Sequence, residues 1–340
     1  MMSFGQGLLH VILVLTLYVH ACTSMDCQLN PLDSNGVALT IAVGHEGKFS
    51  NIQQAIDSIP SGNDKWIRIY ITYGSYKEKI KIPKDKGCLY MEGESQGNTQ
   101  TTISWGDHDS TDQSSTFTAV PDNIVLKNLR VENTYGLYSK EPLKQAVAVR
   151  LLGDKYAIVN CSFIGLQDTL WDGSGRHYFK GSYISGVVDF IWGSGQSIYE
   201  DCTLNVDLKS SYPPRTEGVI VAQGRESESE GDGFVFKWCK ITGGPTMLGR
   251  GYRPYSRVIF YQCHFPNTIL PQGWDAWTGQ GNEHKLTFVE ADNNGPGADL
   301  SKRVPWLKKM SAEELSKFTD LSYINSDGWM AKLPPNYLKW

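Results

Sequence analysis

Residues 160–193 read "NCSFIGLQDTLWDGSGRHYFKGSYISGVVDFIWG" and contain a short pattern twice: a turn residue, a small or apolar residue, then alternating strand-forming residues. The units "NCSFIG" from Asn160 and "KGSYISG" from Lys180 recur as "NLRVEN" from Asn128, "DCTLNV" from Asp201, "WCKITG" from Trp238 and "QCHFPN" from Gln262. Their second residues, at 129, 161, 181, 202, 239 and 263, are 32, 20, 21, 37 and 24 residues apart. This spacing indicates a coil of about 20 to 24 residues, with longer intervals holding loops. Short strands punctuated by Gly and Asn at this period predict an all-β fold, a parallel β-helix.

A β-helix exposes strand edges and a cross-section of its core at each end, so short capping helices are expected there. Ser50 with Gln53 resembles a capping box ahead of a helical apolar pattern that Pro60 ends. Ser311 with Glu314 starts a second helix in "SAEELSKF". The acidic stretch "ESESEGDG" at 226–233 is interpreted as a solvated loop between coils, and no linker divides the body.

The composition is that of a globular protein, with 40% hydrophobic and 20% charged residues and a net charge of -4. Basic residues form no block, so nucleic acid is not an expected partner. The apolar run "LLHVILVLTLYVHACTS" ends in small residues and predicts a signal peptide over residues 1–24, with a signal anchor as the alternative. We expect residues 25–340 to form a single catalytic domain, secreted and monomeric, with no membrane attachment after signal removal.

Seven cysteines occur, at positions 22, 27, 88, 161, 202, 239 and 263, and the first leaves with the predicted signal. They are not spaced as CxxC pairs, so a zinc site is not expected. Acidic residues do not cluster as hard-cation ligands in any motif, which disfavours a calcium-dependent lyase. We therefore expect no metal and no organic cofactor. An oxidising compartment permits disulfides, but the sequence leaves their connectivity open.

Two aspartates, Asp168 and Asp189, are 21 residues apart, one coil length. They should lie on adjacent coils, about 4.8 Å apart in the strand-to-strand direction. Gln145, 23 residues before Asp168, falls roughly one coil earlier and predicts a Gln–Asp–Asp file flanked by Gln167. Two carboxyl groups that close in an apolar setting cannot both ionise easily, so one should stay protonated and the other charged.

Turn aspartates are the structural alternative for either residue alone. A carboxylate pair also serves glycoside hydrolases, so the pair by itself does not choose the reaction. Gln145 and Gln167 carry amide N–H donors suited to stabilising an oxyanion, which favours acyl transfer. No GxSxG motif occurs, so a serine esterase is disfavoured.

At these residues the sequence resembles the plant pectin methylesterase (pectinesterase) family, in the form without an inhibitor-like pro-region. The resemblance covers nearly the whole predicted secreted chain. It is carried by seven ordered motifs: "GSYKEKI" at Gly74, "QAVAVR" at Gln145, "GLQDTLW" at Gly165, "VDFIWG" at Val188, "LGRGYRPYSRVIF" at Leu248, "GWDAW" at Gly273 and "NNGPGAD" at Asn293. It implies a right-handed parallel β-helix.

The resemblance also implies catalytic roles. Asp189 would be the nucleophile that attacks the C6 carbonyl of a methylated galacturonate, and Asp168 the acid that protonates methanol and then activates water. Gln145 and Gln167 would hold the oxyanion, and Arg250 would keep Asp189 ionised and oriented. The implied partners are methylated homogalacturonan and a proteinaceous pectinesterase inhibitor, and the implied location is the cell wall.

Aromatic positions that the family uses to stack on sugar rings match Phe117, Trp171, Tyr252 and Trp274. Two positions depart from the family pattern: Gly251-Tyr252 stands where Pro-Trp is usual, and Trp192 replaces the common Phe. The resemblance further implies a disulfide between Cys202 and Cys239, with Cys161 left as a buried, unpaired thiol.

The leading hypothesis is therefore hydrolysis of pectin methyl esters to pectate and methanol, in pectin degradation and cell wall modification. One alternative is a β-helix glycoside hydrolase, which would release reducing ends instead of methanol. The other is a catalytically silent wall protein that binds pectin, because the changed aromatic near Arg250 could have cost turnover.

Overall fold

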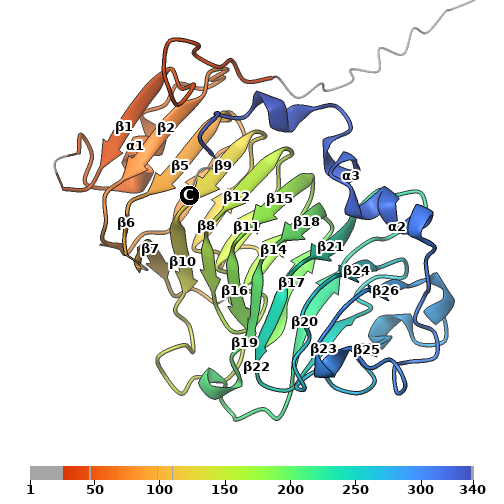
Figure 1. The fold of residues 1–340 in the computed structure, drawn as a ribbon. Helices are drawn as coiled ribbons and strands as arrows, with labels where there is room; N and C mark the ends of the chain where they lie inside the picture. The colour runs from red at the N-terminus through yellow and green to blue at the C-terminus, as the bar shows by residue number, and fades with distance from the viewer. Residues whose placement is uncertain (1–25, 46, 98, 109, 338–340) are drawn as a thin grey trace, which may run out of the picture.

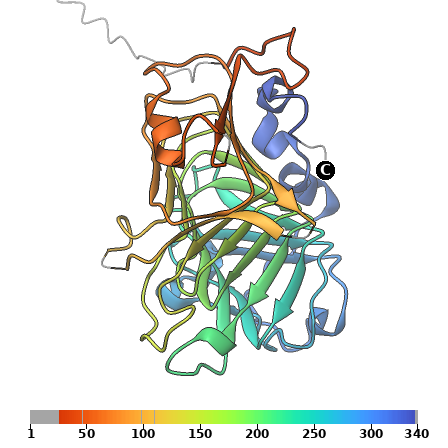
Figure 2. The same ribbon diagram turned by 90° about the vertical axis from the view of Figure 1, so that its left-hand side faces the viewer.

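The strands form a right-handed parallel β-helix built from three sheets. The computed structural model describes residues 26–45, 47–97, 99–108 and 110–337, and the predicted signal peptide at 1–24 lies outside these ranges. Figure 1 shows the strands of successive coils side by side, and Figure 2 shows the turned view of the same stack. The strand pairs are parallel apart from one short antiparallel pair at the edge of the second sheet.

Sheet 1 has ten strands, in the order β1 (Leu39–Val43), β2 (Ile67–Ile71), β5 (Leu89–Gly93), β9 (Ile124–Lys127), β12 (Tyr156–Val159), β15 (Arg176–Lys180), β18 (Gln196–Glu200), β21 (Gly233–Lys237), β24 (Arg257–Tyr261) and β26 (Thr287–Ala291). Sheet 2 runs from β22 (Lys240–Gly243) through β19 (Thr203–Val206), β16 (Tyr183–Gly186), β13 (Ser162–Ile164), β10 (Leu129–Asn133) and β7 (Thr99–Trp105) to β3 (Ser75–Tyr76), with β6 (Ser95–Gln96) paired to β7. Sheet 3 runs from β25 (Trp274–Asp275) through β23 (Thr246–Arg250), β20 (Gly218–Gln223), β17 (Val188–Gly193), β14 (Leu170–Asp172), β11 (Val149–Leu151) and β8 (Phe117–Ala119) to β4 (Ile80–Ile82).

The sequence repeat marks the turn that leads into sheet 2. In five units the first residue adopts positive φ, the left-handed region that Gly, Asn and Asp tolerate best: Asn128 at 54°, Asn160 at 50°, Asp201 at 55°, Trp238 at 58° and Gln262 at 53°. In the unit from Lys180 it is the second residue, Gly181, at 58°. The structure corrects the phase of one unit, because Ser182, not Gly181, stacks between Cys161 and Cys202. The turn therefore uses Gly181.

The interior of the coil is filled by files of stacked side chains. Along sheet 1, Phe179, Tyr199, Phe236 and Phe260 stack in sequence with ring centroids 4.3, 4.6 and 4.5 Å apart. Such offset stacks add about 0.5–1.5 kcal/mol per pair to the burial of each ring. Because adjacent coils repeat the same ring at the same rung, the core is continuous along the axis of the β-helix.

The two predicted helices form, but they cover different parts of the molecule. Helix α1 (Ile52–Asp57) buries Ile52, Ala55 and Ile56 against the first coils, as expected for an end cap. Its N-terminus lacks the predicted Ser50–Gln53 box. Instead the carboxylate of Glu78 accepts from the backbone N–H groups of Ile52, at 2.9 Å, and Gln53, at 3.1 Å.

Helix α2 (Ala312–Thr319) has the predicted capping box of Ser311 and Glu314. With α3 (Ser322–Asn325) and the 3-10 turn η5 (Trp329–Lys332), it packs along the outer face of sheet 1 rather than over an open end (Figure 1). The central strands of sheet 1, such as β9 and β12, are thereby buried on both faces, which explains their apolar sequences IVLK and YAIV. The segment around Trp306 packs against the last coils instead.

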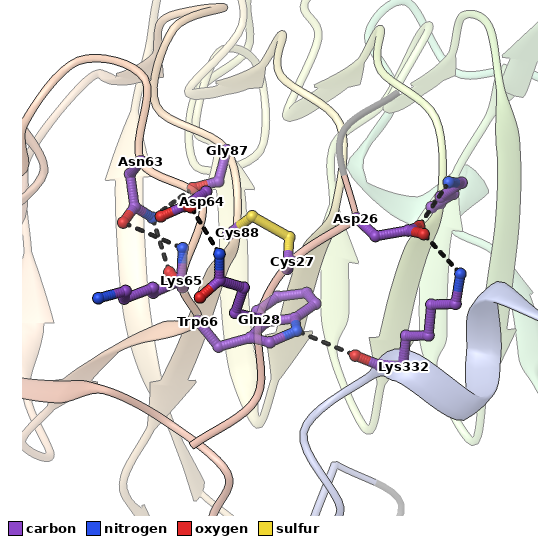
Figure 3. Close-up of a disulfide and its surroundings, with 11 residues drawn as sticks. Asp26, Cys27, Gln28, Asn63, Asp64, Lys65, Trp66, Gly87, Cys88 and Lys332 are labelled. Atoms are coloured by element: carbon purple, nitrogen blue, oxygen red, sulfur yellow. Dashed lines mark hydrogen bonds and ion pairs between the residues drawn. A yellow bond between two sulfur atoms is a disulfide. The ribbon is translucent and has the colours of Figure 1, made fainter. Parts of the chain in front are cut away.

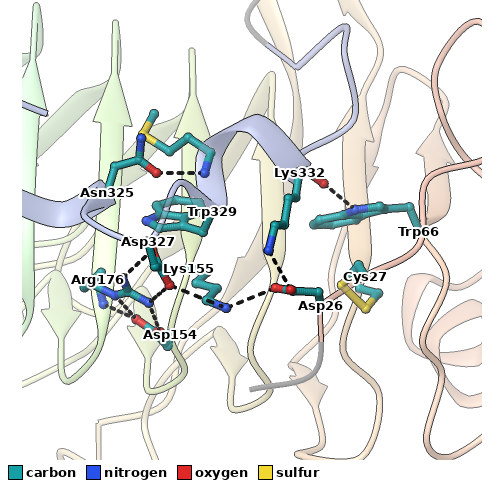
Figure 4. Close-up of polar contacts among 12 residues, drawn as sticks. Asp26, Cys27, Trp66, Asp154, Lys155, Arg176, Asn325, Asp327, Trp329 and Lys332 are labelled. Atoms are coloured by element: carbon teal, nitrogen blue, oxygen red, sulfur yellow. Dashed lines mark hydrogen bonds and ion pairs between the residues drawn. A yellow bond between two sulfur atoms is a disulfide. The ribbon is translucent and has the colours of Figure 1, made fainter. Parts of the chain in front are cut away.

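The N-terminal segment is fixed by a disulfide between Cys27 and Cys88, 61 residues apart (Figure 3). Beside it, the indole of Trp66 donates to the Lys332 carbonyl at 3.0 Å. Figure 4 shows Asp26 between Lys332, at 2.6 Å, and the buried Lys155, at 3.4 Å. These contacts attach Asp26, Cys27 and the 3-10 turn that ends at Lys332 to the outer face of sheet 1.

The disulfide implied between Cys202 and Cys239 is not formed; both residues are buried free thiols, as are Cys161 and Cys263. Cys202 and Cys239 do lie on adjacent rungs of sheet 2. Their thiols instead donate to backbone carbonyls, Cys202 to Glu200 at 3.4 Å and Cys239 to Tyr199 at 3.3 Å. The expectation for Cys161, an unpaired buried thiol, is confirmed.

Replacing both Cys27 and Cys88 by Ser should lower the melting temperature and reduce stability by up to about 4 kcal/mol, because the disulfide closes a loop of 61 residues in the unfolded chain. Thermal unfolding followed by circular dichroism measures the change. Reducing agent should destabilise the wild type and leave the double variant unaffected. Equal melting temperatures for both proteins without reductant would show that the disulfide adds nothing to stability.

Candidate active site

The strand register of sheet 3 decides which side chains reach the outer face. Residues directly paired across the sheet form an inward file of Phe117, Val149, Leu170, Ile191, Val221, Gly249 and Trp274. One residue further along the strands is a second file, which consists of Thr118, Arg150, Trp171, Trp192 and Ala222. Because side chains alternate along a strand, one file lines the core and the other faces the exterior.

Two backbone irregularities near the start of the strands set the direction of the Asp168 and Asp189 side chains. Asp168 and Asp189 both have positive φ, 63° and 49°. In addition, the pairing of β17 with β20 shifts register between Val188 and Ile191, so Asp189 lies in a bulge. Bulges and left-handed residues re-aim side chains at functional sites, at a cost in stability.

The expected catalytic residues come together in one cleft of about 180 Å³ on the outer face of sheet 3. Its walls are Gln145, Gln167, Asp168, Asp189, Trp192, Ala222, Arg250, Tyr252 and Trp277. The predicted file of Gln145, Asp168 and Asp189 is offset by one residue at Gln145. In the structure Gln145 pairs with Gln167, and Gln167 pairs with Val188. The two glutamines therefore stack on each other, one position before the carboxylates.

Arg250 binds Asp189 through two hydrogen bonds, one from Nε to Oδ1 at 2.8 Å and one from Nη2 to Oδ2. The guanidinium also lies 3.7 Å from the ring centroid of Trp277, which covers it. A two-point charge-assisted pair of this kind fixes the orientation of the carboxylate as well as its charge. Burial nevertheless raises the pKa of Asp189, and the Arg250 hydrogen bonds and charge oppose that rise.

Asp168 has a different environment. Burial, followed by the charge of neighbouring Asp189, raises the pKa of Asp168 to about 7, while a hydrogen bond from the Gln145 side chain and the charge of Arg250 oppose the rise. The two carboxyl groups therefore differ in protonation near neutral pH: Asp168 holds its proton more readily, and Asp189 has the cationic partner.

Of the four aromatic residues predicted to bind sugar, the structure places Tyr252 in the cleft and Trp171 beside it. Trp171 stacks on Trp192 with centroids 4.3 Å apart, and the Arg150 guanidinium lies 4.3 Å from its ring. The cleft also contains Trp192 and Trp277, which were not predicted as site residues. Trp192 could have been found because it pairs with Trp171 on the adjacent coil and therefore faces the same side. Trp277 is the second tryptophan of the motif "GWDAW", which also contains Trp274.

Phe117 and Trp274 are corrections, because both belong to the inward file and are buried, with 0% and 1% exposure. Trp274 stacks on Phe288 at 4.6 Å and its indole donates to the buried Glu290 at 2.8 Å. Neither ring can reach a bound sugar in this arrangement. The register of sheet 3, which the sequence motif does not reveal, separates them from Trp171.

Among the described residues, no group of three or more His, Cys, Asp or Glu side chains is arranged to hold a metal ion. Over those same ranges, no helix has the length and apolar character needed to cross a membrane.

The fold and the cleft together define a β-helical carboxylic ester hydrolase. Residues 38–327 match the Pectinesterase family, and the chain belongs to that family. It is 48% identical over 305 residues to the Arabidopsis thaliana protein named "Putative pectinesterase 10", covering 88% of this chain and 89% of that protein. It is 34% identical to "Pectinesterase QRT1" of the same plant, covering 84% and 76% of the two chains.

Solved structures agree with this assignment. "Pectin methylesterase from Carrot" superposes with a TM-score of 0.78 at 29% identity, covering 87% of this chain and 96% of that chain. The structure titled "Crystal Structure of the Pectin Methylesterase from Aspergillus niger in Deglycosylated Form" gives a TM-score of 0.76 at 26% identity, with 92% and 100% covered. Both solved structures are pectin methylesterases, which agrees with membership of the Pectinesterase family and gives no support to the glycoside hydrolase alternative.

Replacing Asp168 by Asn should make the protein more stable than wild type above neutral pH. The native pKa is raised above the unfolded value, so the native state holds a proton that the unfolded state has lost. Wild-type stability therefore falls as pH rises from about 4 to about 7, by at most about 4 kcal/mol for a shift of this size. The Asn variant lacks that decline.

Urea unfolding at several pH values measures this difference. Asp201→Asn is the matched control, since Asp201 is an exposed aspartate with a similar positive φ of 55°. The raised pKa is contradicted if Asp168→Asn and wild type keep a constant stability difference across the pH range.

Proposed function

We propose that this chain, secreted to the cell wall, hydrolyses the methyl esters of homogalacturonan through Asp189 as nucleophile and Asp168 as acid and base. The observation that carries the proposal is the asymmetry of the two buried carboxyl groups. Arg250 pairs with Asp189 in two-point geometry, and Asp168 has a pKa raised to about 7. A nucleophile must be ionised and an acid must hold a proton, and these environments suit those two states.

In the first half of the reaction, the Asp189 carboxylate attacks the carbonyl carbon of the ester. The carbonyl oxygen becomes an oxyanion, and amide N–H donors of Gln145 and Gln167, which pair on adjacent coils and line the cleft, stabilise it. When the tetrahedral intermediate collapses, the bond to the methoxy oxygen breaks and Asp168 donates its proton. Methanol leaves, and Asp189 is joined to the galacturonate as an anhydride.

In the second half, Asp168 is a carboxylate and accepts a proton from water. The resulting hydroxide attacks the galacturonate carbonyl carbon, and the anhydride bond to Asp189 breaks. The products are a free galacturonate carboxyl group and an ionised Asp189, which Arg250 receives again in its two-point pair. One water is consumed and one methanol released, without a metal or organic cofactor.

The substrate is proposed to lie against Trp171, Trp192, Tyr252 and Trp277, whose rings follow one another across the cleft. Trp192 meets Tyr252 edge to face with centroids 6.3 Å apart, and Tyr252 stacks on Trp277 at 5.8 Å. Two of these rings, Trp192 and Tyr252, are the positions that depart from the family pattern. Aromatic rings at both positions support retained contact with sugar rings.

We further propose that residues 1–24 are removed on secretion, that the secreted chain is monomeric, and that a proteinaceous pectinesterase inhibitor is a second partner.

Purified wild type should release methanol from highly methylated pectin, and Asp189→Asn should lower kcat by about a thousandfold or more, since an amide cannot serve as the nucleophile. Methanol is measured directly, and circular dichroism confirms that the variant folds. Asp201→Asn, which removes an exposed carboxylate elsewhere, is the control and should retain full turnover. Pectin binding without methanol release by the wild type would instead establish the silent wall-binding alternative.

The value of kcat should fall as pH rises through about 7, because Asp168 then loses the proton that methanol requires. Stopped assays of methanol over a pH series give the profile. A basic limb with no inflection near this pH would argue against Asp168 as the acid.

A further inference from the structure

The aromatic file inside sheet 1 ends on a charged residue. Phe179, Tyr199, Phe236 and Phe260 occupy equivalent positions on successive strands, and the strand register places Glu290 of β26 next in the same file. A carboxyl group at a core position is costly to bury unless it is paired. The aromatic repeat does not explain why this position is a glutamate.

Glu290 is paired with Arg303, and the two side chains are only 2% and 3% exposed. The Arg303 guanidinium donates from Nε to Oε1 at 2.7 Å and from Nη2 to Oε2 at 3.0 Å. It also donates to backbone carbonyls, from Nη1 to Pro271 at 3.1 Å and from Nη2 to Gly297 at 2.5 Å. These charge-assisted hydrogen bonds fix the buried pair in one geometry.

The buried pair holds the start of β25, the strand that precedes Trp277. The indole N–H of Trp274 donates to Glu290 Oε1 at 2.8 Å. Arg303 packs against the preceding turn, where Gly273 has a φ of 71° and a Cβ atom would lie 2.6 Å from Cδ of Arg303. The turn therefore needs glycine both for its backbone conformation and for the close approach of the arginine.

Asp275, also in β25, connects this strand to the wall of the cleft. Its Oδ1 accepts from the backbone N–H of Trp277 at 2.9 Å, at the start of the 3-10 turn η2 (Trp277–Gly279). Thr278 of the same turn donates to the Gly251 carbonyl at 2.7 Å. Trp277 is therefore fixed relative to the end of β23.

Trp277 in turn covers Arg250. The Arg250 guanidinium lies 3.7 Å from the ring centroid of Trp277 and forms the two-point pair with Asp189. A ring over one face of a guanidinium restricts its rotation and leaves the N–H groups at its edge free to bind a carboxylate. One continuous path of contacts thus leads from Glu290 in the core to Asp189 in the cleft.

We propose that the buried pair of Glu290 and Arg303 is a positioning device for the active site. Through β25 it keeps the ring of Trp277 over Arg250, and so keeps that guanidinium on Asp189. The proposal rests on the proposed function, because that reaction requires Asp189 to be ionised and aimed at the ester. A pair that only closed the end of the core would matter for stability alone.

The charges around Asp189 give the proposal a measurable consequence. Burial raises the pKa of Asp189 and the charge of Asp275 adds to that rise, whereas the hydrogen bonds and charge of Arg250 and the charge of Arg215 oppose it. Asp168 is a further ionisable group beside it. If Arg250 loses its covering ring, its opposing effect weakens, and the nucleophile becomes ionised only at higher pH.

The test uses variants that weaken the path outside the cleft. Trp274→Phe removes the indole N–H that binds Glu290 and leaves the ion pair intact. Trp306→Phe is the matched control, because Trp306 also packs on Phe288, with centroids 5.8 Å apart against 4.6 Å for Trp274. Glu290→Gln, which keeps the shape and removes the charge, is the second test variant. Circular dichroism confirms that each variant folds.

Methanol release over a pH series gives kcat and the acidic limb of kcat/KM. For Trp274→Phe and Glu290→Gln we expect kcat to fall about tenfold and the acidic limb to move up by about half to one pH unit. Trp306→Phe should keep the wild-type kcat and profile. A lower melting temperature for Trp274→Phe, with wild-type kcat and an unmoved acidic limb, would overturn the proposal and leave the pair a purely structural role.

A second measurement needs no substrate. In protein that carries isotope-labelled arginine, NMR follows the Nε–H of Arg250, whose signal is identified by its loss in Arg250→Lys. We expect this N–H to exchange with water about tenfold faster in Trp274→Phe, because the hydrogen bond that protects it is weakened, and at the wild-type rate in Trp306→Phe. An unchanged rate in Trp274→Phe would contradict the positioning role.

The two measurements also separate the proposal from the proposed function. Wild type that releases no methanol, with exchange at Arg250 still accelerated by Trp274→Phe, would sink the proposed function and support the coupling between the core pair and Arg250. Methanol release by wild type, with neither exchange nor kcat altered in Trp274→Phe, would support the proposed function and overturn the coupling.

Discussion

Each coil of this molecule lies in hydrogen-bonded register on the coil before it, and the other features depend on that stacking. Parallel ladders bring equivalent residues about 4.8 Å apart, so one residue type repeated along the sequence becomes a continuous file in space. The aromatic file of Phe179, Tyr199 and Phe236 inside sheet 1 is one result. The outward pair of Trp171 and Trp192 is another. The same rule that fills the core therefore also builds the surface of the cleft.

Two buried carboxyl groups on adjacent coils are costly for the fold. Burial and the charge of Asp189 raise the pKa of Asp168, and both aspartates have left-handed backbone conformations. Arg250 offsets part of that cost on one side only. In the proposed reaction, the resulting inequality between chemically identical side chains allows one to attack and the other to exchange protons. Under the proposed mechanism, this site exchanges stability for reactivity.

The loops that connect the strands place a second layer of specificity around this rigid scaffold. On one side, Leu137 and Leu143 of the 134–146 loop and Leu208 of the 207–217 loop rest on the apolar cluster of Leu166, Val187 and Val188, next to Gln167. Across sheet 3, Tyr252 and Trp277 complete the cleft and shield Arg250. Because the coils cannot change register without exposing the core, differences between related enzymes are most easily accommodated in such loops.

The repeat of the sequence determined the β-helix, and the interval of 21 residues between Asp168 and Asp189 determined that the carboxyl groups would lie close together. The motifs that carry the family resemblance supplied Gln145, Gln167 and Arg250, which the fold brings into the same cleft. Only the tertiary structure decided which aromatic rings face the cleft. Phe117 and Trp274 belong to the inward file, while Trp192 and Trp277 reach the surface. The reason is that a shift of one position turns a strand residue from one face to the other, and that phase depends on pairing with neighbouring coils.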